Sequence, residues 1–167
     1  VYQKKNIFNV CKSACFAAGR IVEKKKVALI HKEIIANKTV WTNGVFDILH
    51  KGHLDLLSYA KTLGTRLIVG INSDKSVKRL KGNSRPINKQ NVRKLALLKL
   101  GFIDDVVIFD KDTPYDNIKL IKPDIIVKGG DYNKNKVVGR DVANVIIFPL
   151  VKGYSTTNII NNSLIKK

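Results

Sequence analysis

The chain of 167 residues has little of several residue types, and each shortage excludes a class of protein. It has only two cysteines, Cys11 and Cys15. They are too few for a disulfide framework, and no further cysteine is present to complete a zinc site. We interpret them as small buried residues in a reducing, cytoplasmic setting. Methionine is absent and residue 1 is Val, which leaves open that the chain is a piece of a longer product.

Long apolar runs are also missing. No run approaches the roughly 20 residues that a helix needs to span a bilayer. The first residues lack the sustained apolar stretch and the cleavage pattern of a signal peptide. We therefore expect no membrane partner. With 44% hydrophobic and 26% charged residues, the composition is that of a globular domain.

Acidic residues are scarce, because 13 Asp and Glu face 31 Lys and Arg, for a net charge of +18. Such an excess invites a nucleic-acid-binding interpretation. However, 25 of the 31 basic residues are Lys, and they are spread over nearly every segment. Together with the abundant Asn and Ile, this spread favours compositional drift on solvent-exposed faces. A nucleic-acid partner is not expected, although the charge would help to recruit anionic substrates.

The spacing of apolar residues predicts two parts, a helical appendage over 1–37 and an α/β domain over 38–167. In the second part, apolar segments alternate with amphipathic ones. Strands are predicted at 39–44, 66–74, 104–110, 123–131 and 142–150, helices at 52–63, 88–101, 113–122 and 155–167, and a basic segment at 76–82. Uniformly apolar strands between helices indicate a parallel sheet with helices on both faces.

Ligands of such sheets bind beyond the carboxyl ends of the strands, at the point where the strand order reverses. Three polar motifs fall at predicted strand ends: Thr42-Asn43-Gly44, Asn72-Ser73-Asp74 and Lys128-Gly129-Gly130-Asp131. They predict the position of the functional site.

The sharpest motif is TNGVFDILHKGH, residues 42–53, in which His50 and His53 flank Lys51 and Gly52 at the start of a predicted helix. Two surface histidines, or a capped helix start, would give the same pattern, and a zinc pair lacks a third ligand nearby. Backbone N–H groups at a helix start gather an anion, and two imidazoles there can donate to phosphate oxygens. The placement favours chemistry on a phosphoryl group.

Four ordered blocks give the chain a specific resemblance. TNGVFDILHKGHLDLL, GINSDKSVKRLKGNSRPIN, DTPYDNIKLIKPDIIVKGGDY and GYSTTNII closely resemble the adenylyltransferase domain of bacterial bifunctional heptose kinase/adenylyltransferases. Those proteins belong to the cytidylyltransferase-like nucleotidyltransferases. The resemblance spans about Lys38 to Lys166 and implies a Rossmann-like fold. Residues 7–35 look like the last helix of the ribokinase-like domain, so we expect no sugar-kinase activity from this chain.

The resemblance assigns roles residue by residue. It implies catalytic roles for His50, His53 and Lys128. It implies nucleotide contacts for Thr42, Asn43, Gly44, Phe46, Asp47, Arg93, Gly129, Asp131, Ser155, Thr156 and Thr157, with Asp47 bracing the nucleotide loop. It implies sugar-phosphate contacts for Lys78, Arg79, Lys81 and Arg85, for each of which a solvated basic loop is an even alternative.

The implied reaction transfers AMP from ATP to heptose 1-phosphate, with Mg²⁺ held mainly by the phosphates. Cytidylyltransferases of this family often carry a basic residue after the Ser-Thr-Thr block, whereas Asn158 and Ile159 follow it here. This difference favours ATP and heptose over a cytidylyl reaction. Two alternatives stay open: a cytidylyltransferase acting on glycerol 3-phosphate or another small phosphate, and a basic nucleic-acid-binding remnant. A homodimer is also left open.

Overall fold

The structure, a computed structural model, describes residues 37–130 and 132–149. Contacts divide the chain into two units, Val1–Ala36 and Asn37–Lys167, and every described residue belongs to the second. The predicted appendage, apart from Asn37, and the predicted helix over 155–167 lie outside the described residues. Both stay predictions.

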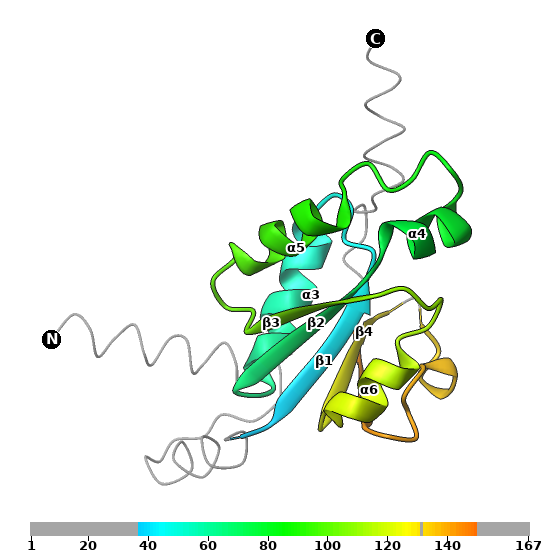
Figure 1. Ribbon diagram of the computed structural model, residues 1–167. Helices are drawn as coiled ribbons and strands as arrows, with labels where there is room; N and C mark the ends of the chain where they lie inside the picture. The colour runs from blue at the N-terminus through cyan, green and yellow to red at the C-terminus, as the bar shows by residue number, and fades with distance from the viewer. Residues whose placement is uncertain (1–36, 131, 150–167) are drawn as a thin grey trace, which may run out of the picture. The chain divides into compact units, whose positions relative to one another are not determined.

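Five parallel strands form one sheet, which Figure 1 shows with its helices. The strands are β1 (Thr39–Gly44), β2 (Arg66–Asn72), β3 (Asp105–Phe109), β4 (Ile125–Gly129) and β5 (Asn144–Phe148). All five predicted strands are confirmed. Their apolar runs reflect burial on both faces, since Val40 and Trp41, neighbours in β1 whose side chains point to opposite faces of the sheet, are both 0% exposed.

The strand order is β3-β2-β1-β4-β5. From β1 the chain builds outward through β2 to β3, then crosses back and places β4 on the other side of β1. The order therefore reverses between β1 and β4. In open parallel sheets a ligand crevice forms at this point, beyond the carboxyl ends of the strands. Those ends are Gly44 in β1 and Gly129 in β4.

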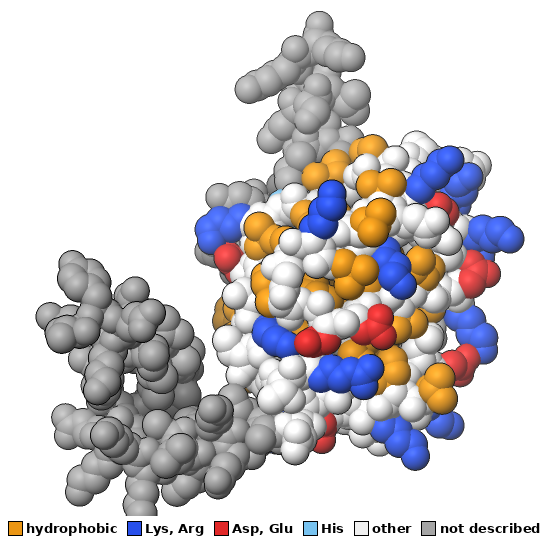
Figure 2. All heavy atoms as spheres, turned by 60° about the vertical axis from the view of Figure 1, so that its left-hand side comes forward, with side chains coloured by type: hydrophobic (Ala, Val, Ile, Leu, Met, Phe, Trp, Pro, Cys, Tyr) orange, Lys and Arg blue, Asp and Glu red, His pale blue; other side chains and the backbone are white. Residues whose placement is uncertain are grey.

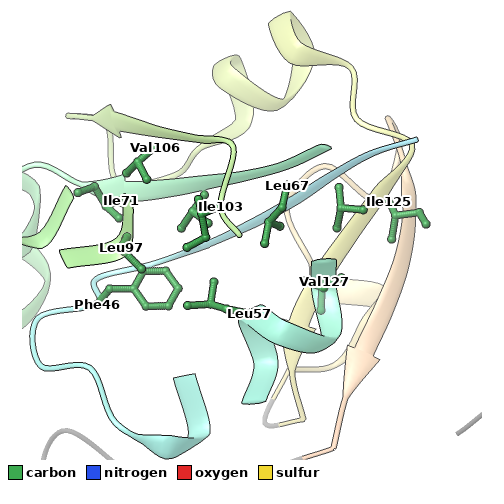
Figure 3. Packing of buried hydrophobic residues seen from close by; sticks show 12 residues of the cluster. Phe46, Leu57, Leu67, Ile71, Leu97, Ile103, Val106, Ile125 and Val127 are labelled. Atoms are coloured by element: carbon green, nitrogen blue, oxygen red, sulfur yellow. The ribbon is translucent and has the colours of Figure 1, made fainter. Parts of the chain in front are cut away.

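Helices cover both faces of the sheet, which confirms the predicted architecture. On one face, α3 (Lys51–Thr62) and α5 (Gln90–Leu98) contribute Leu57 and Leu97 to a core that Figure 3 shows. On the other face, α6 (Tyr115–Ile121) contributes Ile118 to a second cluster built around Trp41. A 3₁₀ turn, η1 (Lys134–Lys136), precedes β5.

Gly70, in the middle of β2, makes room for Trp41 on the neighbouring strand. A Cβ built on Gly70 would lie 2.3 Å from a ring carbon of Trp41, far inside van der Waals contact. The indole is 0% exposed, and its Nε1 donates to Asn43 Oδ1 at 3.3 Å. The packing of Trp41 thus extends to the end of β1.

One helix was not predicted. The basic segment at 76–82 lies largely within α4 (Asp74–Lys81), which follows the carboxyl end of β2. Ser73 caps this helix, because its side chain accepts a hydrogen bond from the N–H of Ser76 at 3.1 Å. Only Ser76 and Val77 are buried in α4, so its basic residues hid the apolar periodicity. Within the described residues, no helix is both long and apolar enough to cross a membrane.

Candidate active site

The chain turns from the end of β1 into α3 through residues 45–50, here called the histidine turn. His50 caps α3: its carbonyl accepts from the N–H of His53 at 2.9 Å, and its Nδ1 faces the same N–H at 3.4 Å. The two imidazole rings stack with their centroids 3.7 Å apart. No acidic residue lies in the first turn of α3. The arrangement favours an anion, because no carboxylate there offsets the N–H groups and the positive end of the helix dipole.

Burial favours the neutral form of both histidines. Burial lowers the pKa of His50 from its usual 6.5. Burial also lowers the pKa of His53, to about 4, with a further contribution from the charge of His50 and an opposing one from a hydrogen bond to the Ile48 backbone. An anionic ligand would reverse the direction of these shifts by favouring the imidazolium form.

Phe46 anchors the histidine turn in the core. Its backbone adopts φ 49°, a left-handed conformation that costs a non-glycine residue on the order of 1–3 kcal/mol. The ring is 5% exposed and packs beside Leu57 and Leu97 (Figure 3), with an edge-to-face contact to His53 at 5.0 Å between centroids. The side chain predicted to meet the nucleotide therefore faces inward and supports His53.

The side chain of Lys128 reaches from β4 to the end of β1, at the point where the strand order reverses. Its Nζ donates to the carbonyl of Asn43 at 3.1 Å and lies 5.0 Å from the ring centroid of Tyr132. Lys128 is 7% exposed, and Tyr132 is 50% exposed. The N–H of Tyr132 donates to the carbonyl of Gly129 at 3.1 Å, which closes the turn after β4. A positive charge is thereby held between the two strand ends where a ligand is expected.

Asp47 links the histidine turn to residues 85–88 through a buried carboxylate. Its side chain is 1% exposed and lies 2.8 Å from both Nε and Nη2 of Arg85. It also accepts from the N–H groups of Ile87, at 2.9 Å, and of Asn88, at 2.8 Å. Arg85, predicted to meet the sugar phosphate, directs its guanidinium at Asp47.

Arg93 is 1% exposed and makes three hydrogen bonds with three different segments. Nη1 donates to the carbonyl of Val45 at 2.8 Å, Nε to the carbonyl of Asn88 at 2.9 Å, and Nη2 to Asp74 Oδ1 at 2.8 Å. The guanidinium, predicted to lie near the nucleotide phosphates, is enclosed beneath the histidine turn.

The remaining predicted sugar-phosphate residues are exposed on α4, where Lys78, Arg79 and Lys81 form its last turn. Arg79 Nε donates to Asp112 Oδ1 at 3.0 Å and Nη2 to the carbonyl of Asp110, both near the end of β3. Among these three basic residues, Arg79 is therefore bonded to the segment after β3, and Lys78 and Lys81 lie exposed at the surface.

Four predicted site residues lie outside the described part of the chain: Asp131, Ser155, Thr156 and Thr157. Conversely, the sequence analysis missed three residues with contacts in or near the site: Asn88, Gln90 and Tyr132. Asp74 was named there as part of a polar motif at a strand end, but without a role of its own. Among the described residues, no three His, Cys, Asp or Glu side chains are grouped to hold a metal ion.

The fold and the site define a class of protein: nucleotide-binding α/β proteins that carry a pair of imidazoles at the start of the helix after β1, next to the point where the strand order reverses. Two solved structures have a similar fold. The crystal structure of the lipopolysaccharide core biosynthesis protein from Thermoplasma volcanium matches with a TM-score of 0.58 and 30% identity, covering 71% of this chain and 98% of that one. Pantothenate synthetase from Thermus thermophilus matches with a TM-score of 0.55 and 16% identity, covering 80% of this chain and 65% of that one, and shows the fold alone.

The chain belongs to the cytidylyltransferase-like family, whose model matches residues 41–162. It is 52% identical over 143 residues to the bifunctional protein HldE of a Nitratiruptor species, and 57% identical over 123 residues to that of Campylobacter fetus subsp. fetus. These matches cover 84% and 73% of this chain but only 31% and 27% of the relatives, so the chain spans less than a third of their length. The chain is a nucleotidyltransferase.

Proposed function

We propose that the chain transfers AMP from ATP to D-glycero-β-D-manno-heptose 1-phosphate and releases pyrophosphate, forming ADP-heptose for the lipopolysaccharide core. The stacked pair of histidines at the start of α3 carries this proposal, because it lies at the strand ends where a nucleotide would bind. Similarity to the lipopolysaccharide core biosynthesis protein and to the HldE proteins supports the substrate class.

In the proposed reaction, an ionised phosphate oxygen of the sugar attacks the α-phosphorus of ATP in line. The new P–O bond joins AMP to the sugar phosphate, and the bond to the β-phosphate breaks as pyrophosphate leaves. The acceptor is already ionised at neutral pH, so the protein need not supply a nucleophile. Its contribution is positioning and stabilisation of the charge that develops on the phosphates.

His50 and His53 would donate hydrogen bonds to the phosphates, and the charge of Lys128 would face the nucleotide between β1 and β4. Asp131 and the predicted helix start at Ser155, Thr156 and Thr157 are proposed to complete the nucleotide site. Lys78 and Lys81 on α4 would attract the sugar phosphate. Mg²⁺ would be ligated by the phosphates of ATP, and when bound it neutralises part of their charge.

The alternative of a cytidylyl reaction is tested with the same assay. Pyrophosphate release is measured for ATP and CTP, each with heptose 1-phosphate and with glycerol 3-phosphate. We expect release with ATP and heptose 1-phosphate alone, and none when heptose 7-phosphate replaces heptose 1-phosphate. Release with CTP and glycerol 3-phosphate would establish the alternative.

A nucleic-acid-binding role is the second candidate, because of the charge of +18. In Figure 2, the Lys and Arg side chains are scattered over the visible face, with acidic and apolar side chains between them. A duplex-binding surface would gather them in one patch. Binding of DNA at physiological salt, without pyrophosphate release, would favour this candidate.

A further inference from the structure

Two of the three arginines that the resemblance assigns to ligand contacts, Arg85 and Arg93, turn their guanidinium groups into the protein. We propose that Arg85 and Arg93 are positioning residues that lock residues 85–88 onto the histidine turn and do not bind substrate phosphates. The inference rests on the proposed function, because it assigns these residues a role in the same site. The 85–88 segment is called the brace below.

The first lock is the carboxylate of Asp47. Oδ2 accepts from Nε of Arg85 at 2.8 Å and from the N–H of Ile87 at 2.9 Å, while Oδ1 accepts from the N–H of Asn88 at 2.8 Å. The Asn88 side chain returns a bond, because its Nδ2 donates to the Asp47 carbonyl at 2.6 Å. Both oxygens of a carboxylate that is 1% exposed are thus occupied by the brace.

The second lock is the guanidinium of Arg93. It joins the carbonyl of Val45 in the histidine turn to the carbonyl of Asn88 in the brace. Its third partner, Asp74, is itself fixed at the start of α4. Asp74 and Gln90 exchange two hydrogen bonds, from Gln90 N–H to Asp74 Oδ1 at 2.8 Å and from Asp74 N–H to Gln90 Oε1 at 2.9 Å.

Through these contacts, the segments that carry the two groups of proposed ligands become one rigid unit. The histidine turn leads into His50, and α4 carries Lys78 and Lys81. A displacement of about 1 Å between reacting groups is enough to cost a large factor in rate. The brace would therefore set the distance from the imidazoles to the basic residues of α4.

A phosphate ligand needs an accessible, uncommitted guanidinium. The Arg93 side chain is 0% exposed and that of Arg85 is 20% exposed, and each is paired with a carboxylate. Removing one partner of such a buried pair leaves the other charge without compensation. The expected consequence is a disturbed histidine turn, which differs from the simple loss of a phosphate contact.

A double-mutant cycle on nucleotide binding tests the proposal. Asp47→Asn, Arg85→Gln and the double variant are titrated with a non-hydrolysable ATP analogue, with no sugar present, after circular dichroism has shown that each is folded. We expect each single variant to bind the analogue about 10-fold more weakly, and the double variant to lose about 10-fold as well, because residues in one network are not additive. Arg66→Gln, an exposed arginine at the amino end of β2, is the matched control and should change affinity less than about twofold.

Rescue by a conservative variant gives the second measurement. Arg85→Lys keeps a charge beside Asp47 and should recover part of the lost affinity and of kcat. If Arg85→Gln binds the analogue as the wild type does and only raises the KM for sugar phosphate, Arg85 is a substrate ligand and the proposal is overturned. If Asp47→Asn does not fold, Arg85→Gln and Arg85→Lys still decide the question. The analogue titration does not depend on the acceptor, so a wrong sugar would overturn the proposed function and leave this result standing.

Discussion

The histidine turn follows the carboxyl end of β1 and α4 follows that of β2, yet the charged side chains of the two regions differ in burial. In the turn, the Asp47 side chain is 1% exposed and receives several donors. On α4, the Arg79 side chain is 47% exposed and its partner Asp112 is 56% exposed. An exposed ion pair contributes between 0 and about 1 kcal/mol, whereas breaking a buried one costs several kcal/mol.

This difference in burial indicates that the two regions have different roles in the reaction. The fixed histidine turn would stabilise the transition state, where misplacement of a donor is costly. The exposed basic turn of α4 would attract the sugar phosphate, where approximate placement is enough. Substitutions in the first region should therefore act on kcat, nucleotide affinity and stability, and those in the second on the KM for sugar phosphate.

The largest effect is expected at the histidines. His53→Ala and His50→Ala should each lower kcat by about 100-fold or more, with a smaller change in KM, as for other oriented stabilisers of developing charge. Steady-state kinetics measures both constants. Because His50 also caps α3, His50→Ser serves as a control that keeps a capping oxygen and lacks the imidazole. Turnover of His50→Ser near that of the wild type would reduce His50 to a cap.

A second test addresses the packing of Trp41, which extends to the end of β1. Gly70→Ala would place a methyl group 2.3 Å from a Trp41 ring carbon, and overpacking of this kind costs about 1–3 kcal/mol. Lys75→Ala, at an exposed position of α4, is the control, because an exposed substitution away from packed groups usually changes stability by less than about 0.5 kcal/mol. Urea denaturation should show the larger loss for Gly70→Ala. Equal losses would contradict the contrast between a packed and an open region.

The lowered pKa of His53 predicts a dependence of stability on pH. The pKa in the folded chain is about 4, against 6.5 in a free histidine. The unfolded chain therefore binds the proton more readily between these values, and the stability present above 6.5 is lost as the pH falls toward 4. His53→Gln should flatten this part of the profile of Tm against pH. Identical profiles for wild type and variant would show that His53 does not titrate in this way.

The smallest effects are expected on α4. Lys78→Ala and Lys81→Ala should each raise the KM for sugar phosphate by about threefold and leave kcat nearly unchanged, since exposed charge pairs contribute less than about 1 kcal/mol. The effect should shrink at high salt because screening weakens the attraction. Lys75→Ala, an exposed lysine in the first turn of the same helix, should change neither constant. A salt-independent loss of kcat at Lys78 or Lys81 would place them in the fixed region.

Local patterns were enough to predict the sheet. Apolar segments between polar ones, including the short TVWTNG, identified all five strands, and glycines at 64 and 101 followed the helices they were expected to end. The polar motifs at the ends of β1 and β4 identified the edge at which His50 and Lys128 lie. The helix α4 was not predicted because basic residues dominate it and Val77 is its one buried hydrophobic residue.

The roles of the arginines could not be predicted locally. The partners of Arg85 and Arg93 include Asp47 and Val45, which lie 38 and 48 residues away along the chain. No periodicity reveals such pairings. An arginine beside a predicted phosphate site looks the same in a sequence whether it meets a ligand or a buried carboxylate, and only the tertiary packing distinguishes the two.

The central claim is that this chain transfers the α-phosphate of ATP, as AMP, to a sugar phosphate. The direct measurement follows two labels, with ATP carrying ³²P at either the α or the γ position and heptose 1-phosphate as acceptor. We predict that the α label appears in the sugar nucleotide and the γ label in pyrophosphate, and that His53→Ala slows both together. A γ label on the sugar, or an α label that never appears in the sugar nucleotide, would contradict the account.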